Sequence, residues 1–493
     1  MPLTIGIDIG TSSTKAVVVD EKGSVLFAGG PTYDFDTPQP LWAENDPQKW
    51  WDATLECLKT ISEVVDSGDV VGIGLTGQMH GLVLLDENGD VLRPCIQWND
   101  QRTAAQCDSI TNEVGFDEVI RITGNPILTG FTAPKIRWVQ ENEPEIWAKV
   151  AKILLPKDYI RYKLSGEFAT DVSDASGMSL LDVGQRKWSS VMTEVCKVSE
   201  DMLAKVYESQ EVSAKLGIEV ATEVGLPAGL PIIAGAGDQA AGAIGSGVVN
   251  EGTVACSLGT SGVVFAQANQ FAPEPEGRLH AFCAAVPGTW HYMGVQLSCA
   301  GSNQWFTDEL GAGVSFRELD DEAAKVAPGC EGLLFHPYLT GERMPHADPL
   351  ARGSFIGLTL RHTRGHLARA VLEGVTLGLR EGLDMMRDLG IATQKVIVTG
   401  GGANSPLWKK LLADIFKSEI VTVNASEGGA FGSAILAMVG AGAYPDLQTA
   451  CSEMIKETGK TIPSDDAAIY DQALETYRKI YPALKEIYPE LCT

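Results

Sequence analysis

Two segments of this chain share a strand–turn–strand pattern built around Gly-Thr-Ser. In the first, DIGTSST at 8–14 joins the apolar stretches TIGIDIG and KAVVVD; in the second, SLGTSGV at 257–263 likewise continues from one apolar strand into another. Two related halves, each offering a turn of small residues, would face each other across a cleft. Because Gly-Thr-Ser is a common tripeptide, a chance similarity is the alternative.

The rest of the chain alternates short, glycine-punctuated strands with helical patterns, which indicates an α/β fold. Three strands are predicted near the N-terminus (TIGIDIG, KAVVVD and SVLFAG), and a turn at 20–23 makes this start antiparallel, unlike a dinucleotide-binding unit. Asp46 as N-cap followed by Pro47 predicts one helix, and Ser405 followed by Pro406 predicts another. At 493 residues the chain is long enough for two large domains.

Composition and charge restrict the class of protein. The net charge of −26 argues against a nucleic-acid partner, because binding a phosphate backbone needs clustered Lys and Arg. The sequence has no signal-peptide pattern and no apolar run of membrane-spanning length, and its ten cysteines lack CxxC spacing. We therefore expect a soluble, reduced, cytoplasmic protein with small-molecule ligands and no membrane partner. A homodimer and a monomer are both open.

The stretch TIGIDIGTSSTK at 4–15 places a carboxylate beside a turn of small hydroxyl residues. It contains neither GxxxxGK[ST] nor GxGxxG, so neither familiar phosphate-binding loop applies. The amides and hydroxyls of the turn can approach phosphate oxygens, and Asp8 can hold Mg²⁺ directly or through water. The alternative is a buried Asp8 whose oxygens are satisfied by loop amides.

Several longer segments resemble the FGGY carbohydrate kinase family. FTAPKIRWVQEN at 131–142 and GSFIGLTLRHTRGHLARAVLE at 353–373 resemble its two signatures. IIAGAGDQAAGAIGSG at 232–247 is similar to the segment with its catalytic aspartate, and VTGGGANSPLW at 398–408 to its adenine-side loop. The resemblance extends over residues 3–445, and the segments follow the family's order along the chain.

This resemblance implies an α/β fold of two ribonuclease-H-like domains, of the actin-like ATPase type, that face a central cleft. The N-terminal domain, expected at 1–248, would hold the sugar and the catalytic base. The C-terminal domain, expected at 249–493, would hold the nucleotide and end in helices. We expect the lobes to close on the sugar, because a kinase must keep water away from the transferred phosphoryl group.

The family motifs imply roles for single residues. Asp238 matches the general base, and its place after a strand and between small residues suits that role; a helix N-cap is the alternative. A carboxylate with an ordinary pKa of about 4 suffices, because the attacking hydroxyl becomes acidic only late in the transfer. The expected sugar contacts are Met79, His80, Gly81, Trp98, Asp238 and Gln239. The expected nucleotide contacts are Thr11, Ser12, Lys15, Gly259, Thr260, Gln304, Gly400, Gly401, Gly402 and Asn404, with Mg²⁺ at Asp8.

Some positions keep alternatives open. Trp98 either offers a flat face to the sugar or packs in the core, and Asp100 with Arg102 makes either sugar contacts or a local ion pair. The three successive glycines at 400–402 are hard to explain by packing alone, because each carries a cost in backbone entropy. Asp171 and Asp174 receive no role.

Motifs such as GLTGQMHGLVLLD at 74–86 and PYLTGERMPH at 337–346 resemble the family members that convert D-xylulose to D-xylulose 5-phosphate with Mg-ATP. Gln239 departs from them, since those members often carry Asn after the catalytic Asp. Another ketose or polyol, such as ribulose, xylitol or a deoxy sugar, is therefore an alternative substrate. A non-catalytic nucleotide switch of the actin type is a further alternative, which the sugar-side Met-His-Gly string opposes.

Overall fold

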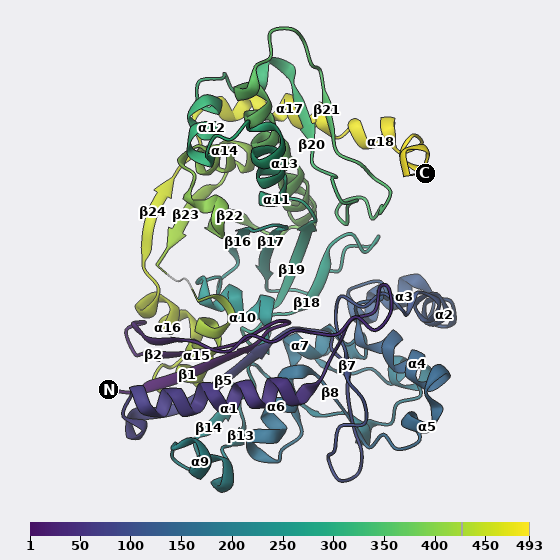
Figure 1. Cartoon of the computed structure of the whole chain (residues 1–493), viewed down its shortest axis with the longest axis vertical. Helices are drawn as coiled ribbons and strands as arrows, with labels where there is room; N and C mark the ends of the chain where they lie inside the picture. The colour runs from purple at the N-terminus through teal and green to yellow at the C-terminus, as the bar shows by residue number, and fades with distance from the viewer. Residues whose placement is uncertain (425–426, 493) are drawn as a thin grey trace.

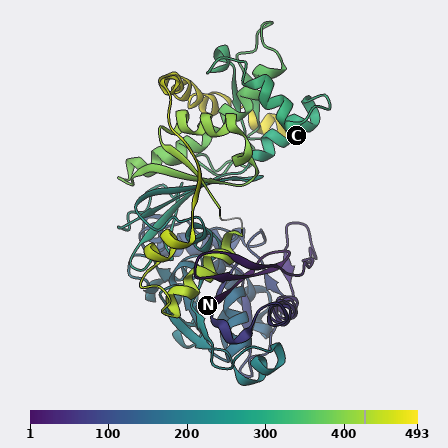
Figure 2. The ribbon, with the colours of Figure 1, turned by 90° about the vertical axis from the view of Figure 1, so that its left-hand side faces the viewer.

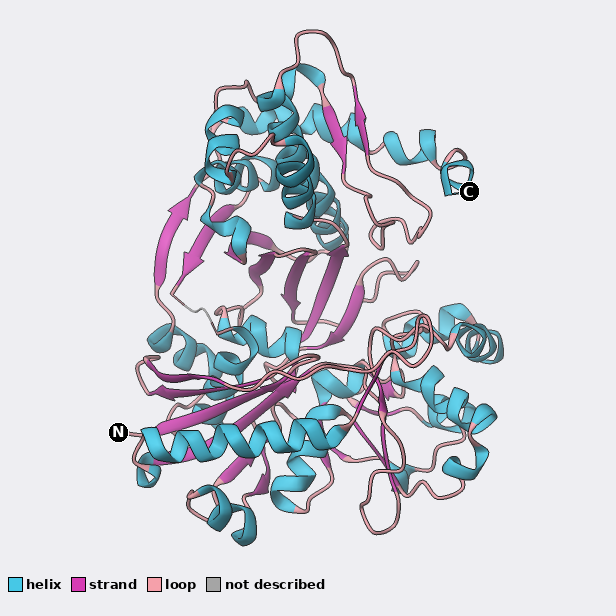
Figure 3. Cartoon of the chain, in the orientation of Figure 1, coloured by secondary structure: helices cyan, strands magenta, loops and turns pink. Residues whose placement is uncertain are grey.

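The computed structural model describes residues 1–424 and 427–492 and has two lobes stacked along its long axis (Figure 1). A large mixed sheet lies at the centre of each lobe, with helices on its faces (Figure 3). Within the described residues, no helix combines the length and the apolar character that crossing a bilayer requires. The described cysteines are all free, and nine of them are buried.

The first sheet has seven strands in the described chain, in the order β13-β14-β5-β1-β2-β3, with β15 beside β5. Their bounds are β1 (Leu3–Ile9), β2 (Thr14–Asp20), β3 (Val25–Gly29), β5 (Val70–Gly77), β13 (Val212–Lys215), β14 (Pro231–Ile233) and β15 (Ala236–Gly237). The three strands predicted at the N-terminus are therefore confirmed, as is their antiparallel start, because β2 pairs antiparallel with both β1 and β3.

The second sheet also has seven strands among the described residues, in the order β18-β19-β17-β16-β22-β23-β24. Their bounds are β16 (Gly252–Leu258), β17 (Gly262–Ala268), β18 (His280–Cys283), β19 (Trp290–Gln296), β22 (Thr393–Thr399), β23 (Glu419–Val423) and β24 (Glu457–Thr461).

The two sheets repeat one topology. In the first, β1 is antiparallel to β2 and parallel to β5; in the second, β16 is antiparallel to β17 and parallel to β22. The outer strands match too, because β13 is antiparallel to β14 as β24 is to β23. Both Gly-Thr-Ser turns follow the equivalent strand, β1 or β16. The repeat is thus structural, and chance similarity was the wrong alternative.

Helices cover both sheets, and shorter strands form small side sheets. Both predicted helix starts are confirmed: Asp46 accepts from the amide of Gln48 at the start of α1, and Ser405 accepts from that of Trp408 at the start of α14. The helices of the first half are α1 (Pro47–Val64), α2 (Ala104–Val114), α3 (Phe116–Thr123), α4 (Thr132–Asn142), α5 (Pro144–Trp147), α6 (Pro156–Ser165), α7 (Val172–Ser176), α8 (Ser190–Val195), α9 (Ile218–Val224) and α10 (Asp238–Gly245). Those of the second half are α11 (Ala300–Leu310), α12 (Phe316–Ala323), α13 (Arg364–Asp388), α14 (Pro406–Phe416), α15 (Gly428–Gly440), α16 (Leu447–Met454), α17 (Ile469–Tyr477) and α18 (Ile480–Leu484). The short strands are β4 (Glu44–Asn45), β6 (Val83–Leu85), β7 (Cys95–Ile96), β8 (Lys152–Leu154), β9 (Ala169–Asp171), β10 (Leu181–Asp182), β11 (Lys187–Trp188), β12 (Lys205–Tyr207), β20 (Leu334–His336) and β21 (Ser354–Ile356).

One helix pair crosses between the halves of the chain. Helices α15 and α16 belong to the second half of the sequence but lie beside β1 and β2, as the yellow-green helices in Figures 1 and 2 show. The contact requires glycine, because a Cβ at Gly6 or Gly74 would lie 1.9 Å from a carbonyl oxygen of α15. The domain boundary at 248/249 stays a prediction, and the first lobe also contains α15 and α16.

Candidate functional site

A cavity of about 840 Å³ lies between the two sheets. The first lobe contributes Asp8 and the start of α10 with Asp238 and Gln239. The second half of the chain contributes the loop after β22, with Gly400 and Asn404. The cavity therefore joins the expected metal ligand, the expected base and part of the expected nucleotide loop, although these residues lie far apart in sequence.

Asp8 reaches this cavity from β1. It pairs in register with Lys15 of β2 and Thr76 of β5, and a Cβ built on Gly429 of α15 would lie 3.0 Å from its Oδ2. Burial raises the pKa of Asp8 to about 6, and the nearby charge of Lys15 opposes that shift. Lys15 itself forms an ion pair with Glu427. Among the described residues, no loop amide donates to Asp8, and its described neighbours are a strand, a lysine and a helix start.

Asp238 is the first residue of α10, directly after β15. Gly237 occupies the N-cap position, so the alternative of Asp238 as N-cap is wrong. Its Oδ1 accepts from the amide of Gln239 at 2.7 Å. Burial, followed by repulsion from Asp8, raises the pKa of Asp238 to about 7, above the ordinary carboxylate value of about 4.

The donor set at Asp8 and Asp238 fits a hard cation. The charge of Asp8 disfavours the charged form of Asp238, and a cation held by these carboxylates would relieve that repulsion. Among the described residues, no three His, Cys, Asp or Glu side chains are grouped closely enough to hold a metal by themselves. Mg²⁺, which keeps water and phosphate ligands around one or two carboxylates, suits such a sparse protein contribution.

His80, an expected sugar contact, follows β5 in the first lobe and lies outside the cavity lining. Its Nδ1 is 2.7 Å from the carbonyl oxygen of Gly177, and its ring stacks on Phe131 at 4.4 Å between centroids. Because a carbonyl only accepts, Nδ1 carries the proton and Nε2 is the acceptor nitrogen. Burial lowers the pKa of His80 to about 3, which keeps the ring neutral. Phe282 of β18, from the second lobe, lies 6.2 Å from the same ring.

The residues on either side of His80 shape this region by packing. Met79 is buried, and a Cβ at Gly237 would lie 2.8 Å from its side chain, so Met79 fills the space beside the residue that precedes Asp238. A Cβ at Gly81 would lie 2.6 Å from the ring of Pro156. Met79 and Gly81 are therefore both closely packed against neighbouring residues of the protein.

Two of the open alternatives can now be decided. Trp98 is 43% exposed and donates from Nε1 to the hydroxyl of Thr11 at 2.9 Å, so it does not pack in the core. Asp100 is fully buried and accepts from Arg102 through both carboxylate oxygens, and Arg102 also stacks on Trp42. Asp100 and Arg102 thus form a local ion pair.

The three successive glycines at 400–402 are not all explained in the same way. Gly400 has a φ of 85°, and a Cβ on it would lie 2.6 Å from the carbonyl oxygen of Leu258; a Cβ on Gly402 would lie 2.8 Å from the same residue. Backbone conformation and packing therefore explain these two, contrary to expectation. Among the described residues, nothing lies within 4 Å of a Cβ built on Gly401, so packing does not require glycine at that position.

The remaining expected nucleotide residues lie outside the cavity lining, on the two turns, on β2 in the case of Lys15, and on α11 in the case of Gln304. Ser12 and Thr260 are exposed on the two Gly-Thr-Ser turns, and the carbonyl oxygens of Gly259 and Thr260 accept from amides at the start of α11. Gln304 donates to both oxygens of Asp308 on its own helix, at 2.8 Å. The sequence did not single out the start of α15, where Gly428 and Gly429 line the cavity; the paired glycines of GGAFGSA were the available signal.

Comparison with known proteins agrees with this architecture. A family model described as the FGGY family of carbohydrate kinases, N-terminal domain, matches residues 3–245, and the corresponding C-terminal domain model matches 254–441. A xylulose kinase of Escherichia coli (strain K12) is 42% identical over 97% of this chain and 99% of its own. A gluconokinase of Bacillus subtilis (strain 168) is 31% identical over 97% of this chain and 94% of its own.

A solved structure has the same fold over its whole length. The crystal structure of xylulose kinase from Rhodospirillum rubrum superposes with a TM-score of 0.93 at 29% identity and covers 99% of both chains. Two family models in the expected order, two sheets of repeated topology and a cleft that joins Asp8 to Asp238 all agree. This chain belongs to the FGGY family of carbohydrate kinases and is a carbohydrate kinase.

Proposed function

We propose that this kinase transfers the γ-phosphoryl group of Mg-ATP to D-xylulose and forms D-xylulose 5-phosphate. The observation that carries the proposal is the shared cavity of Asp8, Asp238 and Gln239 with Gly400 and Asn404. The Met-His-Gly string at 79–81, which matches the family's sugar-contacting segment, supports it too, and the chain is 42% identical to a xylulose kinase over nearly its full length.

In this mechanism, Asp238 is the general base. Its carboxylate accepts the proton of the sugar hydroxyl as that oxygen bonds to the γ-phosphorus, while the bond from the γ-phosphorus to the ADP oxygen breaks. Transfers of this kind have loose transition states, so positioning and charge neutralisation supply most of the rate enhancement. Asp8 would hold Mg²⁺, which supplies positive charge to the phosphate oxygens when bound. The raised pKa of Asp238 matches a group that takes a proton near neutral pH.

His80 would contact the sugar through one defined atom. Since Nδ1 donates to Gly177, Nε2 is available as an acceptor for a sugar hydroxyl and is not a donor to the keto oxygen. The ring of Phe131 beneath His80 limits its rotation. Gln239 and the exposed face of Trp98 would complete the sugar contacts from the same lobe.

The nucleotide would lie across both Gly-Thr-Ser turns. Thr11 and Ser12 on the first turn, Lys15 of β2 after it, and Gly259 and Thr260 on the second turn present amides, hydroxyls and a positive charge suited to phosphate. The loop of Gly400, Gly401, Gly402 and Asn404 would receive adenosine, with closest approach at Gly401. Gln304 stays a prediction for the nucleotide side, and the homodimer stays a prediction as well.

An assay of ATP with a panel of sugars tests the substrate. D-Xylulose should give a kcat/KM at least about tenfold above ribulose, xylitol, deoxy sugars and gluconate, a gap of about 1.4 kcal/mol. The product should carry phosphate on O5, as nuclear magnetic resonance of the isolated product would identify. A clear preference for another sugar would replace D-xylulose, and ATP turnover that ignores every added sugar would favour the nucleotide switch.

A second substrate class has one observation in its favour. Gln239 stands where xylulose kinases often carry Asn, and a gluconokinase is also 31% identical over nearly the whole chain. The side chain of Gln is one methylene group longer than that of Asn, so its amide donor and acceptor atoms occupy a different position in the cavity. Gluconate and the other ketoses therefore belong in the panel at the same concentrations as D-xylulose.

A further inference from the structure

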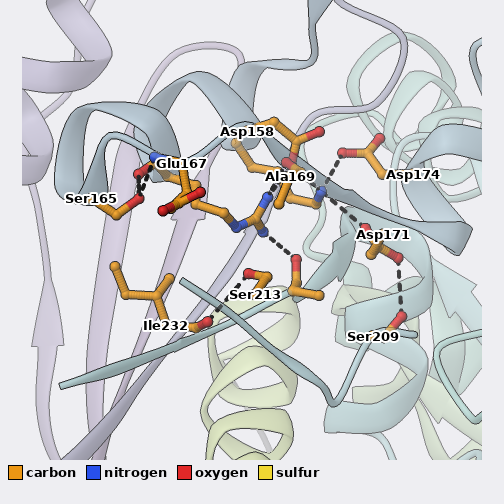
Figure 4. A network of polar contacts seen from close by, with 12 residues as sticks. Asp158, Ser165, Glu167, Ala169, Asp171, Asp174, Ser209, Ser213 and Ile232 are labelled. Atoms are coloured by element: carbon orange, nitrogen blue, oxygen red, sulfur yellow. Dashed lines mark hydrogen bonds and ion pairs between the residues drawn. The ribbon is translucent and has the colours of Figure 1, made fainter. Parts of the chain in front are cut away.

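Behind the sugar side of the cleft, a buried network of charged side chains surrounds Lys157 (Figure 4). The ammonium of Lys157 lies 2.7 Å from Asp158, 2.9 Å from Asp171 and 3.2 Å from Asp174. Arg161 contacts Asp158 at 2.5 Å from the next turn of α6. All five side chains are at most 1% exposed.

Such a cluster is a costly way to hold a fold together. Each buried charge loses its hydration, and apolar side chains of similar volume often stabilise a protein as well or better. Burial also raises the pKa of Asp174 well above its usual range, which favours its neutral form. A network that contributes little stability is best understood through what it holds in place.

The network ends at the residue before the base. Asp171 Oδ2 accepts from the hydroxyl of Ser173 at 2.6 Å and from its amide at 2.7 Å, which fixes the orientation of the Ser173 side chain. With its proton committed to Asp171, the same hydroxyl oxygen accepts from the amide of Gly237 at 3.1 Å. Gly237 is the N-cap of α10, and Asp238 follows it directly.

A second arm of the network holds the same segment. Arg161 donates to the carbonyl oxygens of Ala169, at 2.6 Å, and of Ala234. The contacts at Ala234 and Gly237 therefore hold the backbone on both sides of residues 235 and 236. Gly235 in this segment has a φ of 75°. At the far end of α7, the carbonyl of Gly177 accepts from His80, so one short helix touches both the base segment and the expected sugar contact.

We propose that Lys157, Asp171 and Ser173 form a positioning relay that fixes the amide of Gly237 and thereby aims the carboxylate of Asp238 at the sugar hydroxyl. These are positioning residues, since none of them lines the cavity. The proposal rests on the proposed function, because it takes Asp238 as the base. It also gives Asp171 the role that the sequence left without an assignment.

A matched pair of serine variants tests this relay. Ser209 also donates to Asp171 Oδ2, at 3.0 Å, and is equally buried, but its hydroxyl has no contact with Gly237. Ser173→Ala and Ser209→Ala each remove one buried hydroxyl from one carboxylate oxygen. Only Ser173→Ala should lower kcat, by roughly 10- to 100-fold, as expected when a reacting group is misplaced by about 1 Å. The KM values for sugar and ATP should change less than about threefold, because proton removal belongs to the transition state.

Every other pattern overturns the relay. Equal kcat in the two variants would mean that Ser173 acts only through stability, and a raised KM with unchanged kcat would mean that it acts on binding. If Ser173→Ala does not fold, Ser173→Cys decides by the same comparison, since a thiol packs similarly but accepts weakly. Asp238→Asn is measured in parallel: full activity there would remove the base itself, which is a failure of the proposed function and not of the relay alone.

Discussion

A Cβ atom on Gly429 would lie 3.0 Å from Oδ2 of Asp8, although the two residues belong to opposite ends of the chain. Gly429 is the second residue of α15, so the positive end of that helix adjoins the carboxylate expected to hold Mg²⁺. This contact forms where α15 packs against the sheet of the first lobe. It brings a helix start, a carboxylate and the Lys15–Glu427 ion pair to one side of the cavity.

The first prediction follows from this contact. Gly429→Ala should lower kcat roughly tenfold, because the added methyl group displaces the Asp8 carboxylate by a few tenths of an ångström. Stability should stay equal or rise by up to about 1 kcal/mol, since Ala is the better helix residue. Steady-state kinetics with a Mg²⁺ titration and thermal unfolding measure both effects. Wild-type turnover at every Mg²⁺ concentration would contradict the role of Asp8.

The second prediction concerns His291, which is fully buried and stacks on Phe265 at 4.3 Å. Burial lowers its pKa to about 3, so between pH 6.5 and 3 the unfolded state binds a proton there that the folded state does not. Acidification through this range therefore removes stability. His291→Gln should remove this loss of stability on acidification. The free energy of unfolding of the variant minus that of wild type should therefore be about 2 kcal/mol more favourable at pH 5 than at pH 7.

Urea unfolding at the two pH values checks this second prediction. The comparison of variant with wild type cancels the other groups that titrate in the same range. A stability difference between the two proteins that is the same at pH 7 and pH 5 would contradict the neutral, buried state of His291.

The third prediction concerns the choice of sugar. Gln239→Asn shortens the side chain beside Asp238 by one methylene group and moves its amide away from the sugar that wild type prefers. The kcat/KM for that sugar should fall about tenfold, the value of one hydrogen bond, while kcat/KM for a larger acceptor rises or holds. The same sugar panel measures it. An unchanged ranking of all sugars would remove Gln239 from substrate selection.

The fourth prediction is closure of the lobes. The ring of His80 contacts Phe131 of its own lobe and lies near Phe282 of the other lobe, so aromatic side chains from both lobes meet at the expected sugar site. Small-angle scattering should give a smaller radius of gyration with D-xylulose than without it, because water must leave the cleft before transfer. Equal radii in both states would contradict closure.

Local signals in the sequence predicted a large part of this structure. The helix starts at Asp46 and Ser405 follow from capping chemistry that involves only neighbouring residues. The repeat of Gly-Thr-Ser after equivalent strands follows from the same local reasoning, extended to both halves. The family motifs predicted the residues that line the cavity at Asp8, Asp238 and Gly400.

Other features depend on contacts that no local pattern contains. The return of α15 to β1 is decided by glycines at positions 6 and 74, whose need for close packing is visible only when both elements are placed. The sequence assigned no role to Asp171 and Asp174, because their burial beside Lys157 depends on how α6 and α7 pack together. Gln304 shows the converse, because a motif match could not indicate that its amide donates to Asp308 on its own helix.

The central claim is that Asp238 takes the proton of the sugar. The kcat of Asp238→Asn with D-xylulose and Mg-ATP tests it most directly, with Asp201→Asn, on the exposed surface, as the control. The account predicts a folded variant whose kcat falls roughly 10²- to 10⁴-fold, while the control keeps wild-type turnover. Full activity of Asp238→Asn would contradict it.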